Sequence, residues 1–324
     1  MNKAFSRFQA VILGFIMVLS SSQAFSWGAK GHEIVAGVGA SLSGVPFFTA
    51  NQATAEQLST VPDRVWKATS YAQESPNHWF QGDAYTSNIG LGSLAQFPRG
   101  YSQAVSKMGE RVIVKNGTAP WRINQFYALA LAAIRKGDAK SAMVYVGVMS
   151  HYVGDISQPL HVSENYDGVL TGQKGIHKFF ETDNIVDMVA IQKQVSVQAQ
   201  ALLHNPNYMK LMGSSLIESN FSEIERALMF RDKVLSTDKQ LGRTGRGAAI
   251  QLQLAIARMA DGAATYAVIL NHLWQEAQGK MGATQVSVGD PAFINVDFSQ
   301  LFLGIEMMTP VKAGIDDEED CSLR

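Results

Sequence analysis

The chain has 324 residues, of which 46% are hydrophobic, and its 27 Lys and Arg residues nearly balance its 28 Asp and Glu residues. Such a charge balance excludes a general polyanion-binding surface as the basis of function. Cys321 is the only cysteine, so no intramolecular disulfide can form. Stability must therefore come from an apolar core and from bound metals.

The first 26 residues have the layout of a secretory signal peptide. Lys3 and Arg7 precede an apolar run from Ala10 to Leu19, and small and polar residues lead to a predicted cut before Trp27. The apolar run is shorter than the about 20 residues that a membrane-spanning helix needs. We therefore expect a secreted or periplasmic protein without a transmembrane anchor, with Trp27 as the first residue of the mature chain.

After Trp27, apolar residues recur at helical intervals over most of the chain. The predicted helices cover Ile34 to Leu42, Arg122 to Arg135, Ala139 to Val153, His177 to Ile191, Ile217 to Leu235 and Gly247 to Trp274. The last of these mixes apolar and small residues, as is typical of a buried central helix. Residues 80–120 are rich in Gly, Ser and aromatic residues, which favours a long irregular excursion.

Strand signals are scarce, although Gln285 to Val288 and Phe293 to Phe298 are candidates for short extended pieces. We expect an all-α fold with one multi-helix domain over residues 27–279. A less regular C-terminal extension over residues 280–324 would follow, and its role cannot be predicted from the sequence.

Residues 151–181 carry the strongest signal of chemistry. His151 and Asp155 are four residues apart, as are His177 and Glu181, and His161 lies between the two pairs. Because residues four apart share one face of a helix, each pair can bind one cation. One such pair arises readily by chance on a solvated helix, whereas two pairs this close together indicate a metal site. Imidazole with carboxylate suits zinc, and three protein ligands with an open position define a catalytic site.

The segment between the pairs also predicts how they converge. Pro159 is expected to end the helix that carries His151 and Asp155 and to turn His161 toward the same cavity. Ser157 and Gln158 are candidates to orient ligands by hydrogen bonds, although a solvated loop is the simpler interpretation of the segment.

The order of these residues resembles the superfamily that joins bacterial zinc-dependent phospholipase C to the fungal single-strand-specific nucleases with three zinc ions. In that superfamily the mature chain begins with a Trp whose amine and carbonyl bind a metal, and here Trp27 is followed by His32. The resemblance implies three ligand sets: Asp63, His78, His151 and Asp155 for one zinc ion; His161, His177 and Glu181 for a second; and Trp27 and His32 for a third that shares Asp155.

By this resemblance the fold surrounds a trinuclear zinc cleft, and the reaction is phosphodiester hydrolysis. Clustered zinc ions bind a phosphoryl group, ionise a water and stabilise the departing oxygen. We hypothesise that a nucleophilic hydroxide is held between the two zinc ions that share Asp155. Asp63 would act as the catalytic residue that orients this water or accepts its proton. The zinc ion on the other ligand set would neutralise charge on the phosphate and the leaving alkoxide.

Four residues beside the predicted ligands are candidates for substrate binding: Arg64, Trp79, Phe80 and Asp83. An aromatic residue directly after the metal histidine resembles the nuclease branch, in which Trp79 would stack a base for about 1–3 kcal/mol. Arg64, however, directly follows the metal aspartate, whereas the nuclease pattern has its arginine a few residues further on.

Other features resemble the phospholipase branch. The last ligand is Glu181 rather than an aspartate, and the gap between His161 and His177 is short. The pair Trp79-Phe80 also resembles that branch, although the aspartate that follows it there is displaced to Asp83. Arg64 takes the position of that branch's cation-binding tyrosine, so an anionic group is expected to suit the site better than choline.

We therefore expect a secreted zinc-dependent phospholipase C that cleaves phospholipid head groups and touches a membrane surface transiently. A single-strand-preferring nuclease is the alternative. A non-catalytic protein stabilised by its metals is a third interpretation, disfavoured because structural zinc sites are usually closed and cysteine-rich. Leu91, Leu94 and Phe97 would form one apolar face in a helical turn, which either touches lipid or covers the core, and the core is favoured.

Overall fold

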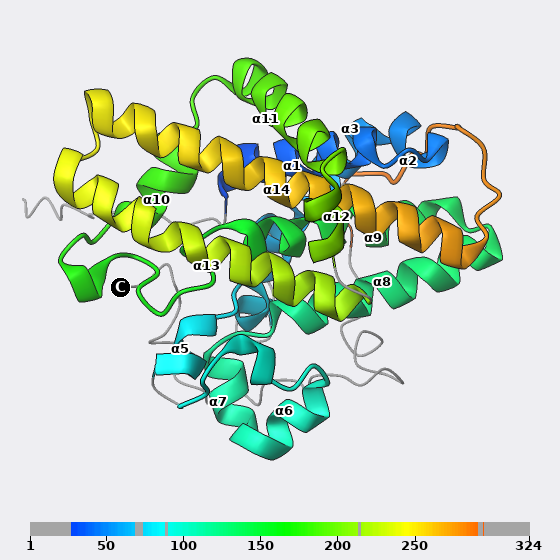
Figure 1. Cartoon of the computed structure of the whole chain (residues 1–324). Coiled ribbons are helices and arrows are strands. Elements are labelled where there is room, and N and C mark those ends of the chain that lie inside the picture. Colours follow the sequence, from blue (N-terminus) through cyan, green and yellow to red (C-terminus); the bar gives the residue numbers. More distant parts are fainter. Residues whose placement is uncertain (1–26, 69–73, 88–89, 213–214, 291–293, 295–324) are drawn as a thin grey trace, which may run out of the picture.

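The computed structural model describes residues 27–68, 74–87, 90–212, 215–290 and 294, which are the coloured parts of Figure 1. The predicted signal peptide and most of the predicted extension after residue 279 lie outside these residues. The described part of the chain is all-α and contains no strand. None of its helices is both long and apolar enough to cross a membrane.

The α-helices are α1 (Gly28–Leu42), α2 (Pro46–Ala50), α3 (Gln52–Leu58), α5 (Gly82–Ser87), α6 (Tyr101–Met108), α7 (Glu110–Lys115), α8 (Ala119–Lys136), α9 (Ala139–Ser157), α10 (Ile176–Lys178), α11 (Met188–Leu203), α12 (Pro206–Leu211), α13 (Leu216–Leu241) and α14 (Gly245–Ala277). Short 3-10 or π turns are η1 (Pro62–Trp66), η2 (Ser75–His78), η3 (Leu94–Gln96), η4 (Val169–Thr171) and η5 (Phe179–Asp183).

Two helical hairpins form the frame. Helices α8 and α9 pack against each other after a sharp turn at Gly137, whose φ of 73° favours glycine. Asp138 then caps α9 by accepting a hydrogen bond from the Ser141 nitrogen at 3.1 Å. Helices α13 and α14 form the second hairpin, and α14 also packs against α1, α9 and α11. The predicted central helix is thus confirmed, with Met259 to Leu270 buried along its length.

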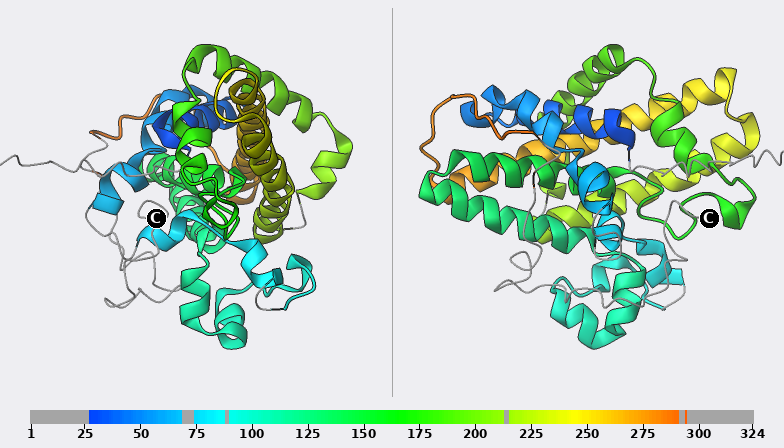
Figure 2. Two further views of the ribbon diagram at one scale, coloured as in Figure 1. Left: turned by 90° about the vertical axis from the view of Figure 1, so that its left-hand side faces the viewer. Right: turned by 180° about the vertical axis from the view of Figure 1, so that it is seen from behind.

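Small residues let α1 approach α14 closely. A Cβ atom on Gly39 would lie 2.9 Å from the Ala263 carbonyl oxygen and 2.5 Å from the Tyr266 ring. On the opposite side of the frame, α5, α6 and α7 gather at one end of the molecule, at the bottom of Figure 1 and of both views in Figure 2. This arrangement places α1, α9 and the turns between them at the centre, where the predicted ligands lie.

Two predictions about elements were wrong in part. The predicted helix from His177 to Ile191 is divided into α10, η5 and α11, because Asp187 caps a new helix by accepting from the Ala190 nitrogen at 3.1 Å. The excursion over residues 80–120 contains α5, η3, α6 and α7 rather than only irregular chain. Apolar residues of these short helices pack into the core, among them Tyr85 of α5, Tyr101 of α6 and Ile113 of α7. Leu94 and Phe97 are buried there, as the core interpretation predicted.

The chain after α14 lies along α2 and α3. Asn51 donates to the Thr284 carbonyl at 2.9 Å and accepts from the Val286 nitrogen at 2.6 Å. Further on, the Trp66 indole donates to the Ile294 carbonyl at 3.1 Å. The candidate extended piece from Gln285 to Val288 forms no strand, and the second candidate lies outside the described residues except for Ile294.

Candidate metal centre

The predicted ligands converge from six different elements and a loop. Helix α1 carries His32, η1 Asp63, η2 His78, α9 both His151 and Asp155, the loop after α9 His161, α10 His177 and η5 Glu181. All eight side chains are buried. They form three groups whose ligand atoms lie within 4.8 Å of one another: His32, His151 and Asp155; Asp63, His78 and His151; and His161, His177 and Glu181.

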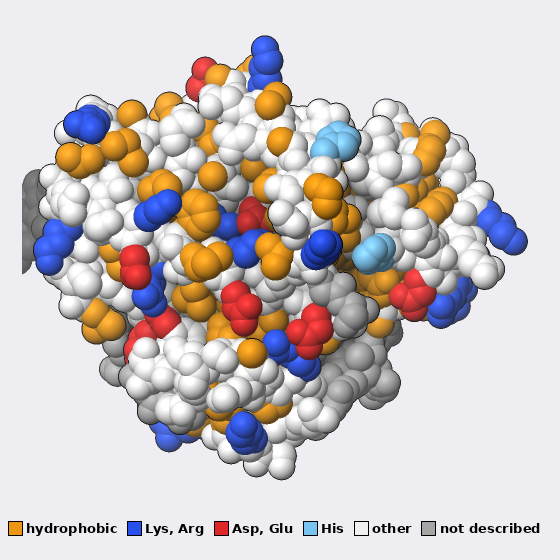
Figure 3. All heavy atoms as spheres, viewed as in Figure 1, with side chains coloured by type: hydrophobic (Ala, Val, Ile, Leu, Met, Phe, Trp, Pro, Cys, Tyr) orange, Lys and Arg blue, Asp and Glu red, His pale blue; other side chains and the backbone are white. Residues whose placement is uncertain are grey.

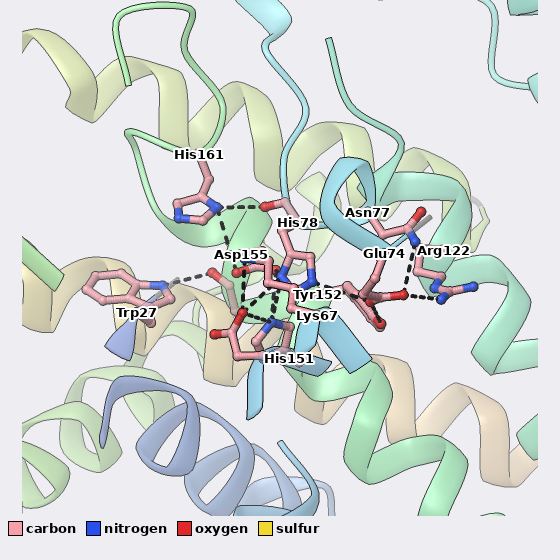
Figure 4. Close-up of polar contacts among 12 residues, drawn as sticks. Trp27, Lys67, Glu74, Asn77, His78, Arg122, His151, Tyr152, Asp155 and His161 are labelled. Atoms are coloured by element: carbon pink, nitrogen blue, oxygen red, sulfur yellow. Dashed lines mark hydrogen bonds and ion pairs between the residues drawn. The ribbon is translucent and has the colours of Figure 1, made fainter. Parts of the chain in front are cut away.

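Asp155 joins the first two groups. Its Oδ1 atom lies 3.5 Å from His32 Nε2, while its Oδ2 atom lies 3.2 Å from His78 Nδ1 and 3.4 Å from His151 Nε2. The two oxygens thus face different imidazoles, around the cluster drawn in Figure 4. A carboxylate in this position can contact two ions, and the bridging role of Asp155 stays a prediction.

The third group is compact. His177 Nε2 lies 2.8 Å from Glu181 Oε2 and 2.9 Å from His161 Nε2. The predicted four-residue pairing of His177 with Glu181 is present although α10 passes into a π turn between them. Helix α9 ends at Ser157, as predicted from Pro159. The loop then brings His161 to within 3.5 Å of Glu181.

Backbone carbonyls fix two of the imidazoles. His151 Nδ1 donates to the Ser59 carbonyl at 2.7 Å, and His161 Nδ1 donates to the His78 carbonyl at 2.6 Å. Each ring therefore turns a bare Nε2 toward its group, which is the form that binds a metal. Gln158 donates to Glu181 Oε2 at 3.0 Å, as expected of a residue that orients a ligand.

The residues present fit zinc. Among the described residues, none donates a hydrogen bond to either carboxylate oxygen of Asp155 or to the Oε1 atom of Glu181, and all three oxygens are buried. An unsatisfied buried oxygen of this kind costs roughly 1–3 kcal/mol, and more when it is charged. Two pairs of imidazole nitrogens lie near these oxygens, His151 with His78 and His161 with His177, and the nitrogens of each pair are 2.9 Å apart. Nitrogen and oxygen donors of this kind are those that zinc binds.

The pKa shifts follow from burial and from neighbouring charges. Burial, reinforced by neighbouring histidines and, for His78 and His151, by Lys67, holds the pKa values of His32, His78 and His151 well below 6.5, so these rings are neutral. Burial, and then the charge of Asp63, raises the pKa of Asp155 well above 3.8. Burial also acts to raise the pKa of Glu181, but His177 and His161 outweigh it and lower this pKa to about 2.

Trp27 lies at the same centre. Its backbone nitrogen donates to Glu181 Oε2 at 3.1 Å, and its indole donates to the Gly154 carbonyl at 2.8 Å. Ser157 contributes a second contact to the indole at 3.2 Å, so its role is to hold Trp27. Gly154 makes room for this arrangement, because a Cβ atom there would lie 2.9 Å from His32 Nδ1.

Sequence reasoning missed two charged residues at the centre. Lys67 Nζ lies 3.1 Å from Asp63 Oδ1, and Glu74 Oε1 lies 3.3 Å from His78 Nε2. Both residues stand four positions from a ligand, so the same spacing rule that found the pairs in residues 151–181 also indicates these two.

Of the substrate-binding candidates, Arg64 is placed to meet a ligand. It is exposed and lines a small pocket of about 90 Å³ together with Ala29, His32, Thr60 and Asp63. His32 and Asp63 are predicted metal ligands, so the pocket opens directly onto the centre.

The expected roles of Trp79 and Phe80 were wrong, because both side chains belong to the core. Trp79 is 5% exposed and its indole donates to the Lys115 carbonyl at 3.2 Å, which leaves no face for a base. Phe80 is fully buried against aromatic rings that include Phe221, and its backbone nitrogen donates to the His161 carbonyl at 3.0 Å.

Asp83 also has a structural position. Its carboxylate accepts from Ser163 Oγ at 2.7 Å, from the Glu164 nitrogen at 2.8 Å and from Arg231. These contacts tie α5 and α13 to the loop that follows His161. Three donors of the protein thus occupy the carboxylate that was expected to contact substrate.

No family model matches the chain. A probable serine protease of Bradyrhizobium tropiciagri is 25% identical to this chain over 190 residues. The match covers 41% of this chain and 24% of that protein, so the chain spans about a quarter of the relative's length.

Two solved structures resemble the fold. One is the alpha-toxin of Clostridium perfringens from avian strain SWCP, with a TM-score of 0.45, 19% identity and coverage of 79% of this chain and 65% of the toxin chain. The other is the alpha-toxin of Clostridium absonum, with a TM-score of 0.44, 15% identity and coverage of 76% and 65%. The chain thus spans less than two thirds of each toxin chain, and conclusions about the site rest on its own residues.

The histidines do not favour a serine protease. Of the seven histidines, five belong to the three ligand groups. The other two, His204 and His272, are exposed and were not predicted as ligands. A catalytic triad needs a histidine oriented by an acid and hydrogen-bonded to a serine hydroxyl. The hydrogen bonds of the buried histidines described above run to backbone carbonyls and to other ligands instead.

Proposed function

We propose that this protein is a zinc-dependent phosphodiester hydrolase of the phospholipase C type. The observation that carries the proposal is the convergence of three buried donor groups, two of which share His151, while Asp155 lies within 3.5 Å of an imidazole of each of these two. An interior with this many imidazoles and carboxylates in contact is costly unless cations neutralise it. The donor set suits zinc, and a shared carboxylate suits neighbouring ions.

We propose the ligands that the sequence indicated, including Trp27 after signal cleavage, for three zinc ions. Bound there, the ions would supply Lewis acidity toward a phosphate ester and lower the pKa of a water molecule. The protein itself provides Asp63 at the wall of the pocket, where its carboxylate can orient a water or take its proton. The buried position of the ligands excludes bulk water from the charges that develop.

A phospholipid is the favoured substrate class. Arg64 at the pocket offers a guanidinium to a phosphate or to an anionic head group. Trp79, which would have stacked a base in a nuclease, is buried. In addition, Figure 3 shows positive and negative side chains interspersed over the face in view, rather than a continuous basic track for a polynucleotide. Export from the cytoplasm and transient contact with a membrane surface belong to the same proposal.

The test is hydrolysis by the purified protein beginning at Trp27. Vesicles of phosphatidylcholine, phosphatidylethanolamine and phosphatidylglycerol are compared with single-stranded DNA, each before and after chelator treatment and zinc restoration. Release of diacylglycerol that is lost with chelator and regained with zinc supports the proposal. DNA cleavage with intact lipid would replace it by the nuclease alternative, and failure to bind zinc would overturn it.

A further inference from the structure

Glu74 is a buried carboxylate that the predicted ligand sets do not use. It directly precedes η2, the turn that ends at His78, and it is fully buried. Its Oε1 atom lies 3.3 Å from His78 Nε2, at ion-pair distance, and this ring nitrogen makes no hydrogen bond within the described part of the chain. The other ring nitrogen of His78, Nδ1, faces the centre at 3.2 Å from Asp155 Oδ2 and 3.6 Å from Asp63 Oδ1. Figure 4 shows His78 between these two sides.

Three donors hold the Glu74 carboxylate. Arg122 Nη2 donates to Oε2 at 2.5 Å, Asn77 Nδ2 donates to Oε2 at 3.3 Å, and the Tyr152 hydroxyl donates to Oε1. Arg122 is itself fully buried. The cluster therefore places a complete ion pair in the interior, one side chain away from the centre.

An ion pair buried to this degree is poorly explained by stability alone. The desolvation of two charges typically costs as much as their attraction returns, so apolar residues of similar volume would serve a purely structural purpose as well. The position of Glu74 Oε1 next to the His78 imidazole indicates a functional role for the charge. A carboxylate that faces the outer nitrogen of a ligand histidine fixes the tautomer and the orientation of the ring.

His78 differs from His151 and His161 in which ring nitrogen faces the centre. His151 and His161 keep their proton on Nδ1, which donates to a backbone carbonyl, and turn Nε2 inward. His78 has the opposite orientation, with Nδ1 inward, so it needs an acceptor at Nε2. Glu74 is the acidic group on that side of the ring.

We propose that Glu74 is a positioning residue that holds His78 in the Nε2–H tautomer, so that a bare Nδ1 faces Asp63 and Asp155. Arg122 pairs with the carboxylate and aims it at the ring. The inference rests on the metal centre of the proposed function. It predicts that Glu74 raises zinc affinity through His78 without touching metal or substrate.

The first test reads the tautomer in the wild-type protein. Histidine labelled with ¹⁵N is incorporated, and the two-bond couplings of the His78 ring are recorded with zinc bound and after its removal. We expect the proton on Nε2 in the zinc-bound sample, whereas without zinc Nδ1 lies 2.9 Å from His151 Nε2 and can carry the proton instead. In the zinc-bound sample, a proton on Nδ1, or zinc bound through Nε2, would overturn the inference. A protein that binds no zinc would refute the proposed function and the inference with it, whereas a zinc-loaded protein with the proton on Nδ1 would refute the inference alone.

The second test separates positioning from packing. Arg122→Met leaves the carboxylate in place, whereas Glu74→Gln combined with Arg122→Met removes both charges with little change in volume. Zinc affinity is measured by competition with a chelator, and Co²⁺ absorption reports the ligand geometry. We expect about a 10- to 100-fold weaker affinity at the His78 group in the double variant than in wild type. Wild-type affinity and an unchanged Co²⁺ spectrum in the double variant would refute the role.

The single variants complete the comparison. Arg122→Met is expected to lose stability, because it leaves a buried charge unpaired, and to lose less zinc affinity than the double variant, because the carboxylate still faces the ring. Glu74→Asp is expected to recover part of the affinity, since it retains the charge. If all variants lost zinc only in proportion to their unfolded fraction, Glu74 would be structural and the inference would be wrong.

Discussion

The backbone nitrogen of Trp27 lies 3.1 Å from Glu181 Oε2, although 154 residues separate the two along the chain. The contact places the start of the described chain inside the ligand cluster rather than at the surface. In the full-length chain this nitrogen is an amide, which lacks an available lone pair. Cleavage before Trp27 would turn it into an amine, and the same atom would then be able to bind a metal.

We therefore expect processing to control zinc content. A protein that begins at Trp27 should bind three zinc ions, and one with a single glycine before Trp27 should bind two, with a corresponding loss of activity. Elemental analysis after dialysis gives the stoichiometry, and a variant with an extra glycine at the C-terminus is the control. Equal zinc content and activity in all three proteins would contradict the role of the terminal amine.

Asp155→Asn should loosen two ions together, because the two carboxylate oxygens face different imidazoles, His32 on one side and His78 on the other. Zinc stoichiometry is again the measurement. Asp83→Asn is a suitable control, since Asp83 is tied to Ser163 and lies outside the ligand groups. That variant should lose stability and keep its zinc, whereas a full complement of zinc in Asp155→Asn would exclude the bridging position.

Gly154→Ala should displace His32, since the added methyl would lie 2.9 Å from its Nδ1 atom. Alanine favours a helix interior by roughly 0.5–1 kcal/mol over glycine, so the variant need not lose stability as it loses zinc. Gly147→Ala in the same helix would press against Leu58 at 2.5 Å instead. We expect this control to be destabilised with unchanged zinc stoichiometry. The reverse pattern of the two variants would argue against a ligand role for His32.

Zinc binding should release protons at neutral pH. Burial and the charge of Asp63 raise the pKa of Asp155 well above 3.8, which favours a proton on this carboxyl that zinc must displace. Against the effect of burial, Glu181 raises the pKa of His177, which favours a second proton, whereas His32, His78 and His151 have lowered pKa values and contribute none. Calorimetry at pH 7 in buffers of different ionisation enthalpy measures the release. A net release of protons is expected, and a binding enthalpy independent of buffer would contradict the prediction.

Arg64→Ala should weaken the binding of anionic head groups in particular. Arg64 is exposed, so water screens its charge and the expected rise in KM is at most about fivefold. Zinc content should not change, because the guanidinium is not a ligand. Arg135→Ala, an exposed arginine paired with Glu276, serves as the control. Identical KM values for phosphatidylglycerol in wild type and Arg64→Ala would remove Arg64 from the substrate site.

Local spacing accounts for what the sequence predicted correctly. His151 with Asp155, and His177 with Glu181, converge because residues four apart share a helical face, and that rule needs no tertiary information. The rule also identified His177 and Glu181, although the continuous helix expected there is replaced by a π turn. The order of the ligands supplied the remaining positions by resemblance.

Burial set by distant parts of the chain accounts for the errors. Trp79 follows a predicted ligand, His78, and was expected to face substrate, but its indole is buried and donates to the Lys115 carbonyl. Phe80 is covered partly by Phe221 from α13, far away in sequence. The partner of Glu74 is equally remote, since Arg122 lies in α8. No local pattern specifies which of these side chains the fold will enclose.

The distribution of the ligand groups also bears on how the protein unfolds. Metal ions bound to these groups would cross-link segments between Trp27 and Glu181. Because the chain has one cysteine and forms no intramolecular disulfide, its stability would depend on these cross-links. The hairpin of α13 and α14 has its own anchor, in which Arg226 and Arg258 pair with Glu223 and Asp261. Loss of metal would thus release the amino-terminal half first and leave the carboxy-terminal hairpin associated, so the molecule would come apart in two stages under a chelator.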